Sequence, residues 1–153
     1  NMRNDQGQLL HSYNRGEARF NAYVVDYAFF IEGLLALHRA TGKQEWLAHA
    51  DTLTQTQIER YWDEKNGGFF FTSSDHETLI ARAKNPIDSV RPSGNSVTAA
   101  NLLYLYKQLD KPEYLKTAQR AIDSVSGILD SSPTAAPRMV IVLGEILELN
   151  SDR

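Results

Sequence analysis

Hydrophobic residues recur at helical spacing in five stretches of the chain: 26–41, 44–62, 96–109, 113–129 and 138–149. The first, third and fifth stretches are apolar on nearly every face, which is typical of helices packed from all sides. The second and fourth are amphipathic, and the second leaves Gln55, Gln57 and Glu59 on a predicted solvent-facing side. This alternation predicts helical hairpins in two layers, with inner helices enclosed and outer helices half exposed.

An internal repeat supports the hairpin arrangement. A shift of 68 residues aligns residues 34–50 with residues 102–118 without a gap, with seven identities in seventeen positions. The repeat units are 26–62 and 94–130, within one predicted domain of residues 1–153. Because the shift places Asp26 over Gly94, both positions are expected at the N-terminal ends of inner helices.

A glycine-led segment with strand-like character precedes each of these two helix starts. Residues 7–25 and 67–85 are rich in β-branched and aromatic residues around polar tips. We interpret both as inserted β-hairpins or long loops. Insertions of this length are usually functional.

Composition and charge exclude several classes of function. The 153 residues carry a net charge of -3 without clustered Lys or Arg, which argues against nucleic acid and anionic membrane partners. The chain has no cysteine, no histidine pair at metal-ligand spacing and no phosphate-binding glycine loop, so we predict no disulfide, no metal site and no cofactor. No signal peptide and no membrane-spanning stretch is apparent, and we expect a soluble cytoplasmic protein.

Several longer motifs carry a family resemblance. They are DYAFFIEGLLALHRATG, YWDEKNGGFFFT, RAKNPIDSVRPSGNSVTAANLLYL and PTAAPRMVIVL. From about residue 16 onward the chain resembles the C-terminal region of the YyaL-like (spermatogenesis-associated) family, whose members carry an N-terminal thioredoxin-like domain. The resemblance implies an all-α fold, an (α/α) toroid similar to six-hairpin glycosidases and N-acylglucosamine 2-epimerases.

The chain departs from the family pattern at two places. The family usually has a second acid before Asp26, where this chain has Val25, and it usually has Gly-Ala after the acid at Asp88, where this chain has Ser89 and Val90. The first departure weakens a mechanism based on paired carboxylates. About two and a half hairpins are present, so we expect a partial toroid, either a fragment of a larger one or a chain that closes by self-association.

The N-termini of the inner helices are the predicted site, because their free N–H groups favour anionic or hydroxyl-rich ligands. Asp88 is the preferred catalytic carboxylate and Asp26 the second, although Asp26 could instead cap its helix and Asp88 could serve a turn. The predicted ligand-binding residues are Tyr27, His76, Arg82, Lys84, Arg91, Ser93, Asn95 and Ser96. Among these, the amide of Asn95 is the most suited to hydroxyl recognition, because Ser93 or Ser96 could cap the helix without it.

Two functions of different class remain open at this point. The first is binding of a sugar-like small molecule at the inner-helix N-termini, with isomerase, epimerase or glycosidase-like chemistry. It rests on fold-level analogy. The second is a non-catalytic helical scaffold that accompanies a thioredoxin-like domain or packs with the rest of a parent chain.

Overall fold

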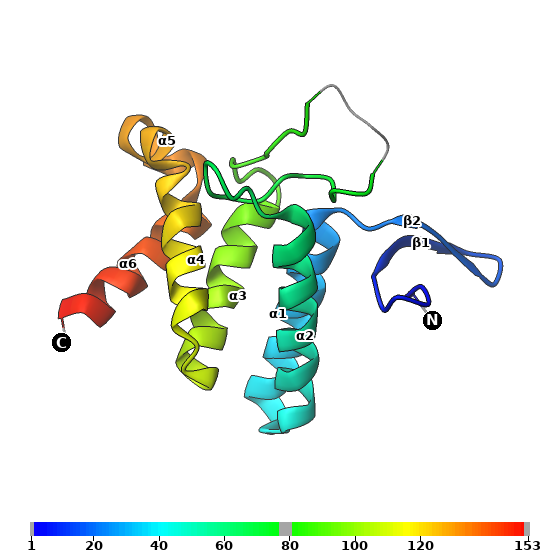
Figure 1. Cartoon of the computed structure of the whole chain (residues 1–153). Helices are drawn as coiled ribbons and strands as arrows, with labels where there is room; N and C mark the ends of the chain where they lie inside the picture. Colours follow the sequence, from blue (N-terminus) through cyan, green and yellow to red (C-terminus); the bar gives the residue numbers. More distant parts are fainter. Residues whose placement is uncertain (1, 77–80, 152–153) are drawn as a thin grey trace.

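Helices make up most of the computed structural model, which describes residues 2–76 and 81–151. The elements in chain order are β1 (Leu10–Asn14), β2 (Glu17–Asn21), α1 (Val24–Thr41), α2 (Gln44–Tyr61), α3 (Gly94–Leu109), α4 (Pro112–Asp123), α5 (Ser126–Ser131), the 3-10 turn η1 (Pro133–Ala135) and α6 (Pro137–Ser151) (Figure 1). The predominantly helical class predicted from the hydrophobic periodicity is confirmed.

Helix α3 lies at the centre of the helical part. It packs against α1 and α6, and α4 lies alongside it, while α2 packs mainly against α1 (Figure 1). Buried aliphatic side chains form these contacts, among them Leu35, Leu53, Leu102, Leu105 and Met139. Burial of each such side chain stabilises the fold by about 1.5 to 3 kcal/mol. Two layers of helices would give these contacts. Helices α1, α3 and α6 are neighbours in one layer, and α2 and α4 pack beside α1 and α3 in the other.

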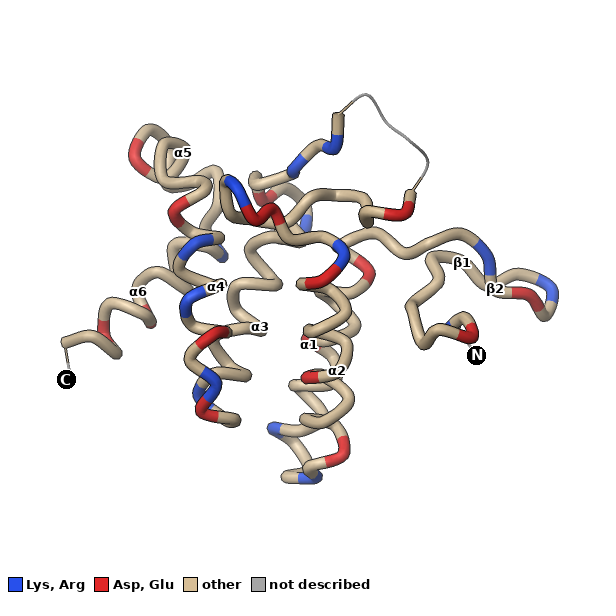
Figure 2. The backbone as a smooth tube through the Cα atoms, in the orientation of Figure 1, with Lys and Arg blue, Asp and Glu red and all other residues tan. Residues whose placement is uncertain are grey.

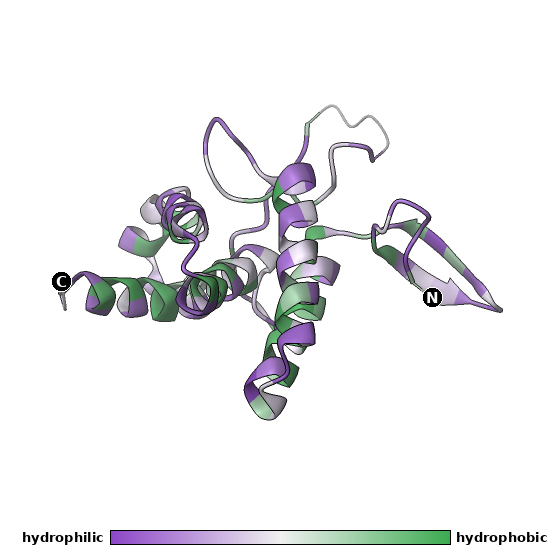
Figure 3. Ribbon diagram, turned by 60° about the horizontal axis from the view of Figure 1, so that its bottom comes forward, coloured by the Kyte–Doolittle hydropathy of each residue, from purple (hydrophilic) through white to green (hydrophobic). Residues whose placement is uncertain are grey.

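The helices α1 and α6 each keep one apolar face exposed. Phe30 and Leu37 on α1 are 49% and 43% exposed, and Ile141 and Leu147 on α6 are both 57% exposed. Hydrophobic residues are frequent along the helix that leads to the C-terminus (Figure 3). The prediction that these two helices are enclosed on all sides is therefore wrong for these faces.

Left-handed residues end the first helix of both helical hairpins. Gly42, with φ 68°, follows α1 and donates its N–H to the carbonyl of His38, and Asp110, with φ 51°, follows α3 and donates to Tyr106. Glycine adopts this conformation without steric cost, and aspartate is one of the few other residues that tolerate it. The two turns lie at positions that the 68-residue shift makes equivalent.

The predicted helix 113–129 is interrupted in the structure. Helix α4 ends at Asp123, and α5 begins at Ser126. At the break, the hydroxyl of Ser124 donates to the carbonyl of Ala121, and a Cβ on Gly68 would lie 2.7 Å from the Ser124 hydroxyl oxygen. The close approach of the Gly67–Gly68 backbone coincides with the break, a tertiary contact that periodicity does not register.

The two inserted segments differ. The first contains the predicted β-hairpin, in which Leu10 pairs with Asn21 and Asn14 with Glu17 around a turn at Arg15 and Gly16, both with positive φ. The second has no strand in its described part. Its two limbs are joined by the Phe71 N–H, which donates to the carbonyl of Ala83 at 2.7 Å. Part of the predicted second β-run, residues 78–80, lies outside the described residues.

One polar residue of α2 lies in the interior instead of on the predicted solvent side. Gln57 is fully buried, and its Nε2 donates to the hydroxyl of Thr98 at 2.9 Å and to the carbonyl of Val24 at 3.3 Å. The side-chain amide thereby links α2 to α1 and α3. Its partners on the two inner helices explain why a polar residue is tolerated there.

Candidate functional site

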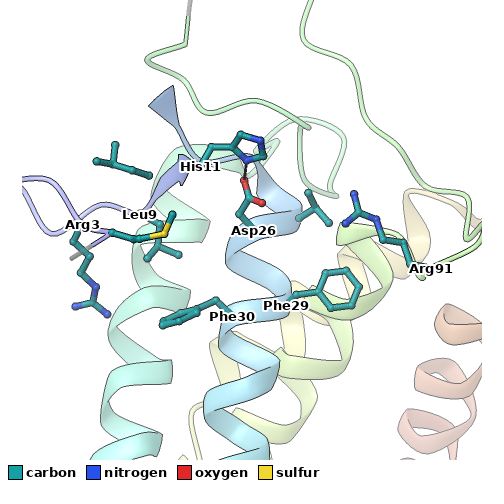
Figure 4. Close-up of a pocket in the computed structure, with 10 residues that line it drawn as sticks. Arg3, Leu9, His11, Asp26, Phe29, Phe30 and Arg91 are labelled. Atoms are coloured by element: carbon teal, nitrogen blue, oxygen red, sulfur yellow. Dashed lines mark hydrogen bonds and ion pairs between the residues drawn. The ribbon is translucent and has the colours of Figure 1, made fainter. Parts of the chain in front are cut away.

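Two hollows lie where the hairpin β1–β2 meets the start of α1. The arginine hollow, of about 550 Å³, is lined by Met2, Arg3, Leu9, Leu10, His11, Val25, Asp26, Phe29, Phe30 and Arg91 (Figure 4). The histidine hollow, of about 580 Å³, is lined by His11, Phe20, Asn21, Tyr23, Thr72, Asp75 and His76. His11 borders both hollows, so they adjoin at its imidazole ring.

A histidine–aspartate pair connects the hairpin to α1. The Nδ1 of His11, on β1, lies 2.8 Å from Oδ2 of Asp26 in the first turn of α1 (Figure 4). The same oxygen accepts the backbone N–H of Tyr23 at 2.8 Å, which holds the carboxylate in place at the helix start. The His11 side chain is 44% exposed, and its Nε2 has no partner among residues 2–76 and 81–151. The carboxylate thus orients an imidazole whose second nitrogen is free to meet a ligand.

Two guanidinium groups border the arginine hollow without a hydrogen bond or ion pair in the described part of the chain. Figure 4 shows Arg3 and Arg91 on opposite sides of Phe29 and Phe30. The guanidinium group of Arg91 lies over the ring of Phe29, with 5.9 Å between its Cζ and the ring centroid. Elsewhere Lys and Arg are interspersed with Asp and Glu along the chain (Figure 2). Unpaired guanidinium groups beside aromatic rings suit a ligand that has both a negative charge and an apolar face.

Aromatic rings and a carboxylate border the histidine hollow. The ring of Tyr23 contacts those of His11 at 5.0 Å and His76 at 5.4 Å between centroids. The hydroxyl of Ser73 lies 2.6 Å from Nδ1 of His76 and donates to Asp75 at 2.5 Å. Burial opposes ionisation of Asp75, but hydrogen bonds from Ser73 and Arg60 outweigh it and lower the pKa of this carboxyl.

Phe20 adds an exposed ring to the same hollow. It is 71% exposed and has a φ of 63°, a left-handed conformation that is costly for an aromatic residue. The ring is therefore presented to solvent at the border of the hollow by a backbone conformation that the hairpin imposes.

Asp88 lies outside both hollows and joins two helix starts. Its Oδ1 accepts the N–H of Ser93 at 2.7 Å, at the start of α3, and its Oδ2 accepts the N–H of Arg138 at 2.9 Å, in the first turn of α6. A turn was the alternative role expected of Asp88 from the sequence, and the second of these two helices comes from 50 residues further along the chain. Its catalytic role remains a prediction, and both carboxylate oxygens are already occupied by backbone donors.

The three polar residues at the start of α3 also serve the fold. Asn95 is buried, and its amide pairs with both backbone groups of Phe69, accepting at 2.7 Å and donating at 2.9 Å. Ser93 is the N-cap of α3, since its hydroxyl accepts the N–H of Ser96 at 3.0 Å. Both serines are buried as well. Ser93, together with Arg91 and Gly94, lines a small hollow of about 100 Å³ at the start of α3. Ligand binding by these residues remains a prediction.

The remaining three predicted ligand residues make internal contacts. Arg82 donates to the carbonyls of Thr72 and Arg60, at 2.5 and 2.9 Å. Lys84 pairs with Asp63 at 2.7 Å. Tyr27 is buried, its hydroxyl accepts the N–H of Leu9 at 3.0 Å, and burial raises its pKa.

The structure therefore brings three of the ten predicted site residues to the hollows: Asp26, His76 and Arg91. It adds His11 and Arg3, which sequence reasoning did not select. No sequence signal links them to Asp26, because they reach it only when the hairpin folds back over the start of α1. In the described ranges, no three His, Asp or Glu side chains gather to hold a metal ion, and none of the helices there is both long and apolar enough to cross a membrane.

The buried ion pair of Asp63 predicts an acid-sensitive fold. The ammonium of Lys84, together with donors from Asn66 and Lys65, holds the pKa of Asp63 well below its usual range. Because the folded-state pKa is depressed, the stabilisation is present above the unfolded-state pKa of about 4 and is lost as the pH falls from there toward the folded-state pKa. Urea unfolding at a series of pH values is expected to show this loss. Asp63→Asn should flatten the slope, whereas the exposed-site control Glu148→Gln should retain it.

Comparison with known proteins relates the chain to part of larger ones. No protein-family model matches it. It is 34% identical over 122 residues to spermatogenesis-associated protein 20 of Mus musculus and of Homo sapiens, a match that covers 79% of this chain. An uncharacterized protein of Caenorhabditis elegans is 31% identical over 147 residues, or 91% of this chain. The matched regions amount to only 15 to 20% of these relatives. The chain is thus homologous, over 79% of its length, to one segment of the spermatogenesis-associated protein 20 sequences.

Proposed function

We propose that the chain binds an acidic, sugar-like ligand at the start of α1. The negatively charged group of the ligand lies in the arginine hollow, and its hydroxylated ring lies in the histidine hollow. The observation that carries the proposal is a pair of guanidinium groups, Arg3 and Arg91, that have no hydrogen bond or ion pair within residues 2–76 and 81–151. They line a hollow that adjoins a second one at His11.

The lining residues match the two parts of such a ligand. Guanidinium groups bind carboxylates and phosphates through charge-assisted hydrogen bonds, and the N-terminal end of α1 adds a partial positive charge. In the histidine hollow, Asn21 and Asp75 can bind hydroxyl groups, and the rings of Phe20 and Tyr23 can pack against the apolar face of a sugar ring.

The fold analogy supports the same ligand class. We take the α1–α2 and α3–α4 hairpins as part of an (α/α) toroid, the architecture implied by the resemblance to six-hairpin glycosidases and N-acylglucosamine 2-epimerases. In that architecture the starts of the inner helices face one mouth. The analogy concerns ligand class alone, and the residues named above carry the site.

Binding of glucuronate, glucose 6-phosphate and glucose, measured by calorimetry, tests the proposal. We expect the two acidic sugars to bind more tightly than glucose. Arg91→Gln and Arg3→Gln should each weaken acidic-sugar binding about tenfold, since a hydrogen bond to a charged group is worth about 1.5 to 3 kcal/mol. Arg19→Gln is the matched control, because Arg19 pairs with Glu17 on the same hairpin and lines neither of these hollows.

Equal binding of neutral and acidic sugars, or no effect of either arginine substitution, would contradict the charge-based proposal. Absence of binding would instead favour the second candidate, a non-catalytic helical scaffold. The observation in favour of the scaffold is the exposed apolar face on both α1 and α6. Such faces suit contact with further helices of a longer chain, with a second copy or with a thioredoxin-like domain.

A further inference from the structure

The hydrogen bond between His11 and Asp26 determines where the imidazole carries its proton. An ionised carboxylate can only accept, and Oδ2 of Asp26 lies 2.8 Å from Nδ1 of His11. A neutral His11 must therefore donate from Nδ1–H, and its Nε2 then carries a lone pair. The backbone N–H of Tyr23 holds the same carboxylate oxygen, so the pair is fixed at the start of α1.

The free nitrogen belongs to a ring that borders both hollows. The His11 side chain is 44% exposed and has no second partner within residues 2–76 and 81–151. The arginine hollow that it borders also contains Arg3 and Arg91. An imidazole base and two guanidinium groups that line the same hollow supply a proton acceptor and positive charge for the removal of a proton from the carbon adjacent to a bound carboxylate.

We infer that His11 is the proton acceptor, and Asp26 its positioning residue, in a proton transfer from the carbon next to the carboxylate of a bound uronic acid. This inference rests on the proposed binding of acidic sugars. In the ligand proposal, His11 only lines the two hollows. Here it has a chemical role.

The step balances without an oxidant or a reductant. The C–H bond at C5 of the uronate breaks, its proton moves to Nε2 of His11, and its electron pair becomes shared between C5 and the carboxylate oxygens. The guanidinium groups of Arg3 and Arg91 stabilise the added negative charge. Return of a proton from Nε2 to C5 regenerates the uronate. Because Nε2–H exchanges with water, the step replaces H5 by deuterium in D2O.

The first test measures the proton position directly. In the full chain with 15N-labelled histidine, the nitrogen chemical shifts of neutral His11 should report protonated Nδ1 and unprotonated Nε2. Asp26→Asn should reduce this preference, because an amide can donate as well as accept. His11 in the opposite tautomer would overturn the inference, whether or not a sugar binds.

The second test follows H5 of glucuronate in D2O by proton NMR, with binding measured in parallel by calorimetry. We expect the full chain to catalyse exchange and His11→Gln to lose at least about 100-fold of the rate while still binding glucuronate. His49→Gln is the matched control, since His49 is an exposed histidine that lines neither hollow.

The outcomes separate the two proposals. Binding of glucuronate without exchange overturns the proton-transfer inference and leaves acidic-sugar binding intact. Exchange that survives His11→Gln overturns the assignment of His11. Absence of glucuronate binding contradicts the proposed function, and the inference that rests on it is then also rejected.

Discussion

Asn95→Ala is expected to lower the free energy of unfolding by about 2 to 6 kcal/mol. The Asn95 side chain pairs with the N–H of Phe69 at 2.7 Å and with its carbonyl at 2.9 Å, as a neighbouring strand would. Both residues are buried, so alanine leaves two backbone groups without partners in the interior. Each such group costs about 1 to 3 kcal/mol. Urea unfolding monitored by circular dichroism measures the difference.

Two substitutions sharpen this experiment. Asn14→Ala, at an exposed hairpin position, should change stability by less than about 0.5 kcal/mol. Asn95→Asp keeps an acceptor for the Phe69 N–H but places a carboxylate against the Phe69 carbonyl, so it should also be strongly destabilising. If Asn95→Ala leaves stability within about 1 kcal/mol of the parent chain, the structural role of this amide is rejected and the predicted ligand role regains support.

Asp88→Ala should lower the free energy of unfolding by about 1 to 4 kcal/mol. Its carboxylate accepts one N–H at the start of α3 and one in the first turn of α6. Loss of a side-chain cap costs about 0.5 to 2 kcal/mol per helix, and two helices lose theirs here. Amide hydrogen exchange should also accelerate in the first turn of α6. Equilibrium unfolding and exchange measured by NMR give the two readouts.

Asp88→Asn separates the structural role from a catalytic one. Its amide retains one acceptor oxygen, so we expect about half the loss of stability caused by Asp88→Ala. Asp5→Ala, at an exposed position, is the control and should be nearly neutral. A change under about 0.5 kcal/mol for Asp88→Ala would contradict the double cap and would favour the carboxylate as a free catalytic group.

Local patterns predicted much of the helical framework. The five periodic stretches correspond to α1, α2, α3, α4 with α5, and α6, because each apolar stripe must find a partner surface whatever the topology. The turn at Gly42 was also accessible, since glycine after a periodic run is a common helix end. The break at Ser124 was not, because it coincides with a contact to Gly68 from a distant segment.

The candidate site was predictable only in part. Asp26 was selected because acids often start helices, and His76 and Arg91 because their segments flank the inner-helix starts. Their presence in the hollows agrees with that placement. His11 and Arg3 became candidates only through the hairpin, which brings Nδ1 of His11 to 2.8 Å from Asp26 across 15 residues of chain.

By itself, the sequence determined where the helices lie and that the polar stretch before Val97 starts one of them, because propensity, capping and periodicity act over a few neighbouring residues. The tertiary structure decided which polar groups are used internally. Gln57, Asp88 and Asn95 each form hydrogen bonds with partners that are 26 or more residues away along the chain. His11 and Arg91, in contrast, keep polar atoms without described partners, since the same packing leaves them at the border of a hollow. Burial and pairing depend on distant parts of the chain, which is why the local pattern could not distinguish the two groups.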